Sequence, residues 1–371
     1  MLIEIHMLQN HAPSNLNRDD TGSPKDCVFG GVPRARISSQ CLKRSIRQSV
    51  LFREELSGFL GSRTRTLPKR VQEESAKLGC DPTVSQLIAK KASGLGSSKE
   101  SDDGETRQLI FLGDAEVPTL ARRLKELCEQ HGKEKFESMK TDDLEKALSS
   151  KELPRSVDIA LFGRFTTSAA FEDVQAAMQV QHAFSTGRIE NEFDYFTAVD
   201  DLIDRSEDQG AGMIGDVEFN SATYYKYFSL HWDQLVRNLG GDVETARRAV
   251  AAFVKAAALT TPSGKQNGFA AHNPPDLVLI EVKREHVPVS YANAFVDPVH
   301  RGPNGDIVEG SIRALSDYAT RLKTAYAIQP VSSAYLSVRD VALTGSTPEA
   351  SLPTLIQVTL TAVDGAPEAT V

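Results

Sequence analysis

The sequence has few of the features that mark a metal-bound, disulfide-bonded or membrane-spanning protein. Only four of its 371 residues are cysteine, and none lies in a C-x-x-C pair. Such spacing argues against a zinc site and against a disulfide framework, so we expect free thiols. No apolar run approaches the roughly 18 to 20 residues of a membrane-spanning helix. Glu4 and His6 stand where a signal peptide would be apolar, and we expect a cytoplasmic protein with no membrane partner.

Local motifs for catalysis are equally scarce. The sequence contains neither the H-E-x-x-H pattern of zinc proteases nor the G-x-S-x-G pattern of serine hydrolases. The segment Pro262–Lys265 resembles the end of a phosphate-binding P-loop, but Leu259 and Gln266 stand where that motif requires Gly and Ser or Thr. We therefore reject nucleotide hydrolysis and expect no cofactor.

Negative charge exceeds positive charge overall, but positive charge is concentrated near the start of the chain. The formal net charge is −8, yet residues 1–70 hold 12 Lys or Arg against 6 Asp or Glu. The remaining residues hold 30 against 44, so a basic segment precedes an acidic body. A basic face has the sign that binds nucleic acid, although a solvated charge cluster is the alternative interpretation.

Apolar periodicity predicts an α+β fold with a helical insertion. The run Leu2–Leu8 partly alternates with polar residues, which is typical of a strand buried mainly on one face. The segment Asn10–Pro33 is rich in Asn, Pro, Asp and Gly and predicts a loop, whereas residues 52–154 predict helices without a strand. Further expected elements are strands at Val157–Phe162, Gln179–Phe184, Thr223–Leu230 and Asp276–Val282, a helix at Asp242–Leu259, a projecting loop or hairpin at Asp201–Asn220 and a loose end from Gly345.

The most informative local pattern is a stripe of polar and cationic residues on one predicted helix. Leu42, Ile46 and Val50 recur every four residues and give this helix an apolar face. Ser38 or Ser39 can cap its first turn, where free backbone N–H groups favour phosphate. The i, i+3, i+4, i+7 spacing places four other residues on the opposite face, and we call them the cationic stripe: Gln40, Lys43, Arg44 and Arg47.

Further cations precede this helix. Arg34 and Arg36 would point the same way in an extended segment, and Arg18 and Lys25 lie in the long loop. If about five of these cations each neutralise one phosphate, affinity for a single strand falls with salt at a log–log slope of about 3 to 4. The sequence therefore predicts that residues 18–47 grip a nucleic-acid backbone.

Several runs of residues in this segment resemble a known family. They are Asn17-Arg18-Asp19-Asp20, Lys25-Asp26, Phe29-Gly30-Gly31, Arg36-Ile37-Ser38-Ser39-Gln40 and Leu42-Lys43-Arg44. The similarity continues in Val157–Arg164, Phe196–Leu202, Ala271–Asp276 and Ala292–Phe295. By these motifs the chain resembles the crRNA-binding backbone subunits of the type I-E CRISPR surveillance complex, Cascade, which belong to the RAMP superfamily.

The resemblance implies an α+β fold in the form of a hand. Its palm would be related to the RNA-recognition-motif (ferredoxin-like) fold, with an inserted helical finger domain and a β-hairpin thumb. The expected segments are a palm at 1–53, 155–190 and 223–345, a finger at 54–154, a thumb at 191–222 and a C-terminal tail at 346–371.

The resemblance also implies a subunit that holds guide RNA and does not cut it. Such subunits polymerise along the guide, grip its phosphates and kink it at intervals, so that the guide can pair with target DNA in antiviral defence. The implied partners are the CRISPR guide RNA, other copies of the chain, target DNA and the other Cascade subunits, which are the large, small, 5′-end-capping and 3′-end endoribonuclease subunits.

Two groups of RNA-binding residues follow from the resemblance. Those expected on guide phosphates are Arg18, Lys25, Ser38, Gln40, Lys43, Arg44 and Arg47, to which we add Arg34, Arg36 and Arg164. Those expected to border the kinks are Phe165, Phe196, Thr197 and Ile214. Wedging beside a base is worth about 1 to 3 kcal/mol and tolerates any sequence. Met213 is the alternative to Ile214 as the wedge, and an ordinary core aromatic is the alternative for Phe165.

Two other functions are alternatives at this stage. Related backbone subunits in other CRISPR types cut target RNA with an aspartate, so a metal-dependent ribonuclease is one of them. The candidate carboxylates are Asp19, Asp20 and Asp26, with a second group at Asp200, Asp201 and Asp204. The first group could instead pair with Arg18 and Lys25 to orient the loop. The other alternative is a metabolic enzyme with an incidental basic helix, which predicts that no RNA copurifies.

Overall fold

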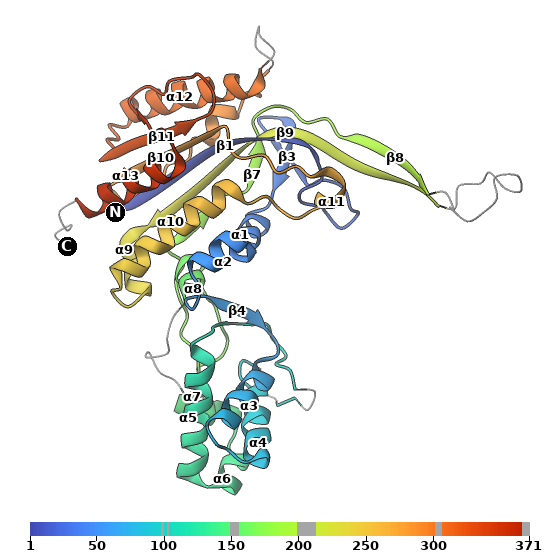
Figure 1. Ribbon diagram of the computed structural model, residues 1–371, viewed down its shortest axis with the longest axis vertical. Coiled ribbons are helices and arrows are strands. Elements are labelled where there is room, and N and C mark those ends of the chain that lie inside the picture. Colours follow the sequence, from blue (N-terminus) through green and yellow to red (C-terminus); the bar gives the residue numbers. More distant parts are fainter. Residues whose placement is uncertain (98–99, 102–103, 149–155, 199–212, 301–305, 366–371) are drawn as a thin grey trace, which may run out of the picture. The chain divides into compact units, whose positions relative to one another are not determined.

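The computed structural model describes residues 1–97, 100–101, 104–148, 156–198, 213–300 and 306–365 (Figure 1). The chain divides into two compact units. The sheet unit comprises Met1–Phe52, Val180–Ser229 and Phe253–Val371, and the helical unit comprises Arg53–Gln179 and Leu230–Ala252. Residues 155–179 and 230–252, which we expected in the palm, therefore belong to the helical unit. Among the described residues, no helix is long and apolar enough to cross a membrane.

The sheet unit is built on a large mixed sheet. Ten strands of the described chain join it in the order β12-β11-β10-β1-β9-β7-β3-β2, and β6 and β8 pair with β9 off this path. β1 is antiparallel to β10 and β10 to β11, whereas β11 and β12 are parallel. The strands are β1 (Leu2–Ser14), β2 (Asp26–Phe29), β3 (Val32–Ile37), β6 (Met178–Val180), β7 (Ala183–Ser185), β8 (Glu192–Ala198), β9 (Met213–His231), β10 (Leu277–Lys283), β11 (Ser332–Ser337) and β12 (Thr347–Pro348).

The first strand lies in the middle of this sheet, which corrects the expectation that it is buried mainly on one face. All residues from Leu2 to Gln9 are buried, including Glu4 and His6 at 0% exposure. Glu4 forms an ion pair with Lys283, and Nδ1 of His6 shares a hydrogen bond of 2.8 Å with the Tyr225 hydroxyl. Polar side chains are tolerated in a central strand because such partners replace water.

The predicted loop Asn10–Pro33 contains strands that the prediction missed. β1 continues to Ser14, and β2 pairs with β3 around a turn at Gly30 and Gly31, whose φ angles are 61° and 78°. Glycine adopts such angles without strain. A Cβ atom on Gly30 would lie 1.8 Å from the carbonyl oxygen of Val296, so this turn packs directly on a segment far away in sequence.

Helices pack on this sheet. α12 (Ile307–Ala325) buries Ile312 in a cluster with residues of β1 and β10. α13 (Leu352–Asp364) begins with a capping box of Ser351 and Thr354, so the expectation of a loose end from Gly345 was wrong. The unit also contains α1 (Ser39–Gln48), α11 (Gln266–Phe269) and the 3-10 helix η1 (Ala292–Phe295), while α2 (Val50–Glu55) and α10 (Val243–Leu259) include residues of both units.

The helical unit has an apolar core of its own and a small second sheet. Leu120, Leu124, Phe136 and Leu144, from three of its helices, are at most 1% exposed. β4 (Gly61–Thr64) pairs antiparallel with β5 (Ile110–Gly113), so the expectation of an insertion without strands was wrong. The helices are α3 (Leu67–Lys77), α4 (Pro82–Ser93), α5 (Glu116–His131), α6 (Lys133–Ser138), α7 (Thr141–Leu148), α8 (Val157–Phe162) and α9 (Trp232–Asn238).

The run Val157–Phe162 forms the helix α8 and not the expected strand. All six residues are buried, and a short continuous apolar run does not distinguish a buried helix from a buried strand. Asp158 Oδ1 accepts a hydrogen bond from the Gly61 N–H at 2.9 Å and so connects α8 to β4. The expected strands Thr223–Leu230 and Asp276–Val282 are confirmed by β9 and β10, and the expected helix by α10. The strand expected at Gln179–Phe184 is instead divided into β6 and β7.

Candidate nucleic-acid interface

The loop after β1 is ordered by its own polar groups. The carbonyl oxygen of Asn17 accepts from the Lys25 N–H, and its Oδ1 accepts from the Ser38 N–H, both at 2.8 Å. Asp19 Oδ1 accepts from the N–H and the hydroxyl of Thr21 at 2.9 and 2.8 Å. Hydrogen bonds from the Thr21 hydroxyl and from loop N–H groups lower the pKa of the Asp19 carboxyl. Asp19 therefore orients the loop as an anion.

Helix α1 presents part of the predicted cationic stripe. Ser38 is its N-cap and accepts from the Cys41 N–H at 3.2 Å, and being 7% exposed it serves mainly as a cap. Leu42 and Ile46, each 3% exposed, anchor the opposite face as predicted. The stripe residues that reach the surface are Gln40 and Arg44, which are exposed, and Lys43, which is partly exposed.

The C-terminal end of the stripe differs from the prediction. Arg47 is only 9% exposed, and Val50, expected on the apolar face, is 65% exposed. Val50 leaves the apolar face because α1 ends at Gln48. Ser49 Oγ then accepts from the Phe52 N–H at 3.2 Å and starts a new helix, in which Phe52 takes the buried position. We therefore remove Arg47 from the predicted phosphate contacts.

Arg34, also predicted to grip phosphate, is 0% exposed. All of its guanidinium N–H groups point at protein carbonyls, at donor–acceptor distances of 2.6 to 3.3 Å. Burial lowers the pKa of this guanidinium. The accepting carbonyls belong to Phe29, Ser185, Thr186, Phe295 and Val296. Arg34 therefore ties the β2–β3 turn to β7 and η1, and it is not part of a surface for RNA.

Arg36, two residues further along β3, remains partly exposed. Its Nε donates to the carbonyl oxygen of Asp26 at 2.9 Å, and its Nη1 lies 3.3 Å from His182 Nδ1. Its own N–H donates to the carbonyl oxygen of Lys25 at 2.8 Å, which brings the loop beside the strand. We define the basic surface as Arg18, Lys25, Arg36, Lys43 and Arg44, all exposed or partly exposed.

A hollow of about 510 Å³ adjoins the basic surface, with Arg18 and Arg44 among its lining residues. Ser263–Gly264 forms another part of its wall, which sequence reasoning had treated only as a failed P-loop. A Cβ atom on Gly264 would lie 2.5 Å from the carbonyl oxygen of Leu16, so only glycine allows this approach. The sequence signal that could have indicated this wall of the hollow was the glycine followed by a lysine, Gly264-Lys265.

β8 and β9 form an antiparallel pair that projects from the sheet (Figure 1). Thr197 lies opposite Ile214, and Phe196 lies opposite Gly215. Opposed residues share a face and neighbours alternate, so Thr197 and Ile214 lie on one face and Phe196 on the other. Ile214 is 61% and Phe196 39% exposed. The side chain of Met213, the alternative wedge, lies outside the described part of the chain.

Two further aromatic residues on β8 were missed by sequence reasoning. Phe193 and Tyr195 are 66% and 65% exposed. By strand alternation they lie on the same face as Thr197 and Ile214. The signal was the alternation of acidic and aromatic residues over Glu192–Tyr195, which is typical of a strand with one aromatic face.

In the helical unit, the two neighbouring candidates behave differently. Phe165 is 87% exposed, which excludes the alternative of a core aromatic. Arg164 is 5% exposed, with Nη1 2.8 Å from Glu116 Oε2 and Nε donating to the carbonyl oxygen of Glu172 at 3.0 Å. Turning this arginine outward to a phosphate would leave the buried carboxylate of Glu116 without its partner, which is costly. We therefore correct the assignment of Arg164 to RNA.

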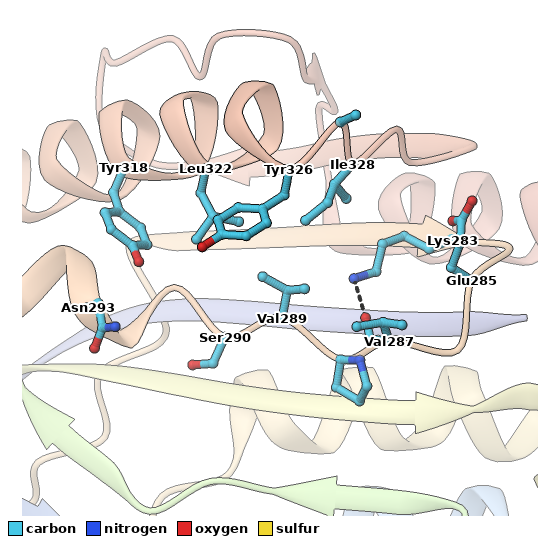
Figure 2. A pocket seen from close by; sticks show the side chains of 12 residues that line it. Lys283, Glu285, Val287, Val289, Ser290, Asn293, Tyr318, Leu322, Tyr326 and Ile328 are labelled. Atoms are coloured by element: carbon cyan, nitrogen blue, oxygen red, sulfur yellow. Dashed lines mark hydrogen bonds between the residues drawn. The ribbon is translucent and has the colours of Figure 1, made fainter.

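A second hollow, of about 660 Å³, lies between α12 and the segment after β10 (Figure 2). Tyr318 and Leu322 line it from α12, opposite Val287. Lys283 is the one cation among the described residues that line it, and its Nζ donates to the carbonyl oxygen of Val287 at 2.9 Å and pairs with Glu4. This mainly apolar hollow does not suit a phosphate.

Comparison with known proteins places this architecture in a family. The sequence profile of a family described as CT1975-like protein matches residues 3–358. The chain belongs to the CT1975-like family. No curated protein matches the sequence.

Two solved structures extend the comparison of this CT1975-like chain. One is a chain described as "CRISPR RNA-guided surveillance complex, pre-nicking", with 32% identity and a TM-score of 0.83 over 98% of this chain and 100% of that chain. The other is a chain described as "CRISPR RNA-guided surveillance complex", with 28% identity, a TM-score of 0.61 and the same coverage. The similarity therefore extends over both units, along nearly the full length of the CT1975-like chain.

Proposed function

We propose that the chain is a backbone subunit of a type I-E Cascade complex that holds guide RNA without cutting it. The observation that carries the proposal is the 32% identical match, over 98% of this chain, to a chain of an RNA-guided surveillance complex. A subunit of this kind has to accept any guide sequence, and contacts to phosphates carry no sequence information. In this proposal the sheet unit serves as the RNA-recognition-motif-like palm, the inserted helices as the finger and β8–β9 as the thumb.

The basic surface supplies the grip on the guide. Its cations come from the loop after β1, from β3 and from α1, and hydrogen bonds of Asn17 and Arg36 hold these elements together. Five positive side chains on these elements would follow successive phosphates of a single strand. Ser263, in the wall of the adjoining hollow, adds a hydroxyl donor to the same phosphate path.

The β8–β9 pair supplies the wedge that kinks the guide. Ile214 and Phe196 lie on opposite faces of a thin two-stranded ribbon, so each can contact the base on its own side of a kink. Copies of the chain would then polymerise along the guide, each kinking the strand held by its neighbour. The remaining partners in this proposal are target DNA and the large, small, 5′-end-capping and 3′-end endoribonuclease subunits.

The alternative function, a metal-dependent ribonuclease, would use Asp19, Asp20 or Asp26. Asp19 favours holding over cutting, because its Oδ1 already accepts hydrogen bonds within its own loop. The group around Asp200 lies outside the described residues. Incubating the purified chain with RNA and magnesium separates the two functions. RNA fragments that require the metal and vanish in Asp19→Ala or Asp20→Ala would refute the holding role.

Charge reversal tests the grip directly. Lys25→Glu with Arg44→Glu should weaken binding of single-stranded RNA at least tenfold and lower the salt slope by about 1.4, because two phosphate contacts are lost. The matched control is Arg313→Glu with Arg321→Glu, which changes the net charge equally on the exposed side of α12. Equal weakening by both variants would show that only net charge matters and would contradict a defined basic surface.

A further inference from the structure

An exposed histidine lies against the basic surface, and sequence reasoning gave it no role. His182 stands between β6 and β7, and its backbone neighbour Gln181 is fixed by a 3.0 Å hydrogen bond from its N–H to the carbonyl oxygen of Tyr227. The imidazole Nδ1 accepts from the Ser39 N–H, in the first turn of α1, at 3.3 Å. The guanidinium Nη1 of Arg36 lies 3.3 Å from the same Nδ1. The ring is therefore held in one orientation beside two elements of the grip.

These contacts define which nitrogen of His182 carries the proton. Both groups that approach Nδ1 are donors, so Nδ1 acts as the acceptor and the neutral ring carries its proton on Nε2. Burial, together with the positive charges of Arg36, Lys25 and Lys43, lowers the pKa of this imidazole. At neutral pH the ring is thus an uncharged donor through Nε2–H. Within the described residues, no side chain or carbonyl accepts a hydrogen bond from Nε2.

We propose that His182 is an additional RNA contact whose Nε2–H donates a hydrogen bond to a phosphate oxygen of the guide. The inference rests on the function proposed above and deepens it. The exposed ring stands among three cations of the basic surface, where a bound phosphodiester provides acceptors. Because the donor is neutral, it adds geometric definition to the backbone path without adding a counterion-dependent contact.

Two amide substitutions separate the donor from the packing role of the ring. In His182→Asn, the amide oxygen can replace Nδ1 as acceptor of the Ser39 N–H, but no donor reaches the position of Nε2. In His182→Gln, the longer amide carries an N–H donor close to that position. Affinity of the full chain for a short single-stranded RNA is measured at about pH 8, where the imidazole is neutral, across a range of salt concentrations.

We expect His182→Asn to weaken RNA binding about tenfold with an unchanged salt slope, and His182→Gln to bind nearly as the natural chain does. Natural affinity in a folded His182→Asn variant would overturn the inference. Equal weakening in both variants would also overturn it, because the ring would then act only by packing on α1. A salt slope lowered by about 0.7 in His182→Asn would refute the neutral donor.

The same experiment distinguishes a failure of the proposed function from a failure of the role of His182. The Lys25→Glu, Arg44→Glu variant is measured beside the histidine variants. If it binds RNA as tightly as the natural chain, the proposed function fails. If it binds weakly while His182→Asn binds normally, only the role of His182 fails. Thermal unfolding of each variant identifies any loss of affinity that comes from misfolding.

Discussion

Replacing Arg34 by methionine tests whether this arginine stabilises the fold or binds RNA. Arg34 and Arg36 are alternate residues of one short strand, and their sequence context does not distinguish them. The structure does distinguish them, because Arg34 is 0% exposed and Arg36 is partly exposed. Arg34→Met should therefore destabilise the sheet unit, whereas Arg36→Met should weaken RNA binding at nearly constant stability.

The size of the effect follows from the contacts. The guanidinium of Arg34 makes five hydrogen bonds to carbonyls, each with a net worth of about 0.5 to 1.5 kcal/mol. Methionine keeps most of the packing of the aliphatic stem. The carbonyl oxygen of Thr186 also keeps a hydrogen-bond donor after the substitution, because it accepts from the Val299 N–H at 3.0 Å. We therefore expect a loss near the lower end of the sum, about 3 kcal/mol.

Equilibrium unfolding in urea, followed by circular dichroism, measures this loss. Fluorescence alone would report on the wrong region, because the single tryptophan, Trp232, lies in the helical unit. Arg36→Met is the matched control, and we expect it to cost less than about 1 kcal/mol. A loss for Arg34→Met no larger than that for Arg36→Met would refute the assignment of Arg34 as the internal tie between β2–β3, β7 and η1.

Three further predictions follow from other residues. Burial lowers the pKa of His6 to about 4 and that of His11 to about 3. Below pH 6.5 the folded state therefore binds fewer protons than the unfolded state. The free energy of unfolding should fall on acidification by up to roughly 2 to 3 kcal/mol per pH unit between about pH 6 and 4. An unchanged melting temperature across that window would contradict this. Gly264→Ala should lower both stability and RNA affinity, because its Cβ would meet the carbonyl oxygen of Leu16 at 2.5 Å; a normal melting curve would argue against the close approach. Ile214→Gly should leave RNA affinity largely intact but relax the kinks, and smoothly stacked guide bases past this residue in the natural assembly would exclude it as a wedge.

Local signals in the sequence were sufficient for the elements that depend on near neighbours. Helix α1 is one example, because its cap at Ser38 and its apolar pair Leu42 and Ile46 lie within nine residues of one another. The strand β10 is another, since the β-branched residues Val278, Ile280 and Val282 favour a strand over a helix. The six residues of α8 are too few for a period to emerge, so the same apolar character was assigned to the wrong element.

The burial of two arginines could not be predicted in this way. The partners of Arg34 include Thr186 and Phe295, which lie 152 and 261 positions further along the chain. Arg164 is paired with Glu116, 48 positions earlier. A cation in a basic segment is predicted to be solvent-exposed unless its tertiary partners are known, and only the fold identifies those partners.

Excluding the buried arginines from the phosphate contacts lowers the expected salt dependence of RNA binding. The sequence offered eight cations for phosphate, whereas the basic surface contains five, because Arg34, Arg47 and Arg164 are at most 9% exposed. At about 0.7 per phosphate contact, contacts from all eight cations would give a log–log salt slope near 5.6, whereas the five exposed cations give a slope near 3.5, within the range of about 3 to 4 expected from the sequence. Titration of a single-stranded RNA that occupies one copy of the chain separates these values. A slope near 5.6 would mean that RNA binding draws buried arginines to the surface, and the stability expected from Arg34 would then have to fall when RNA binds.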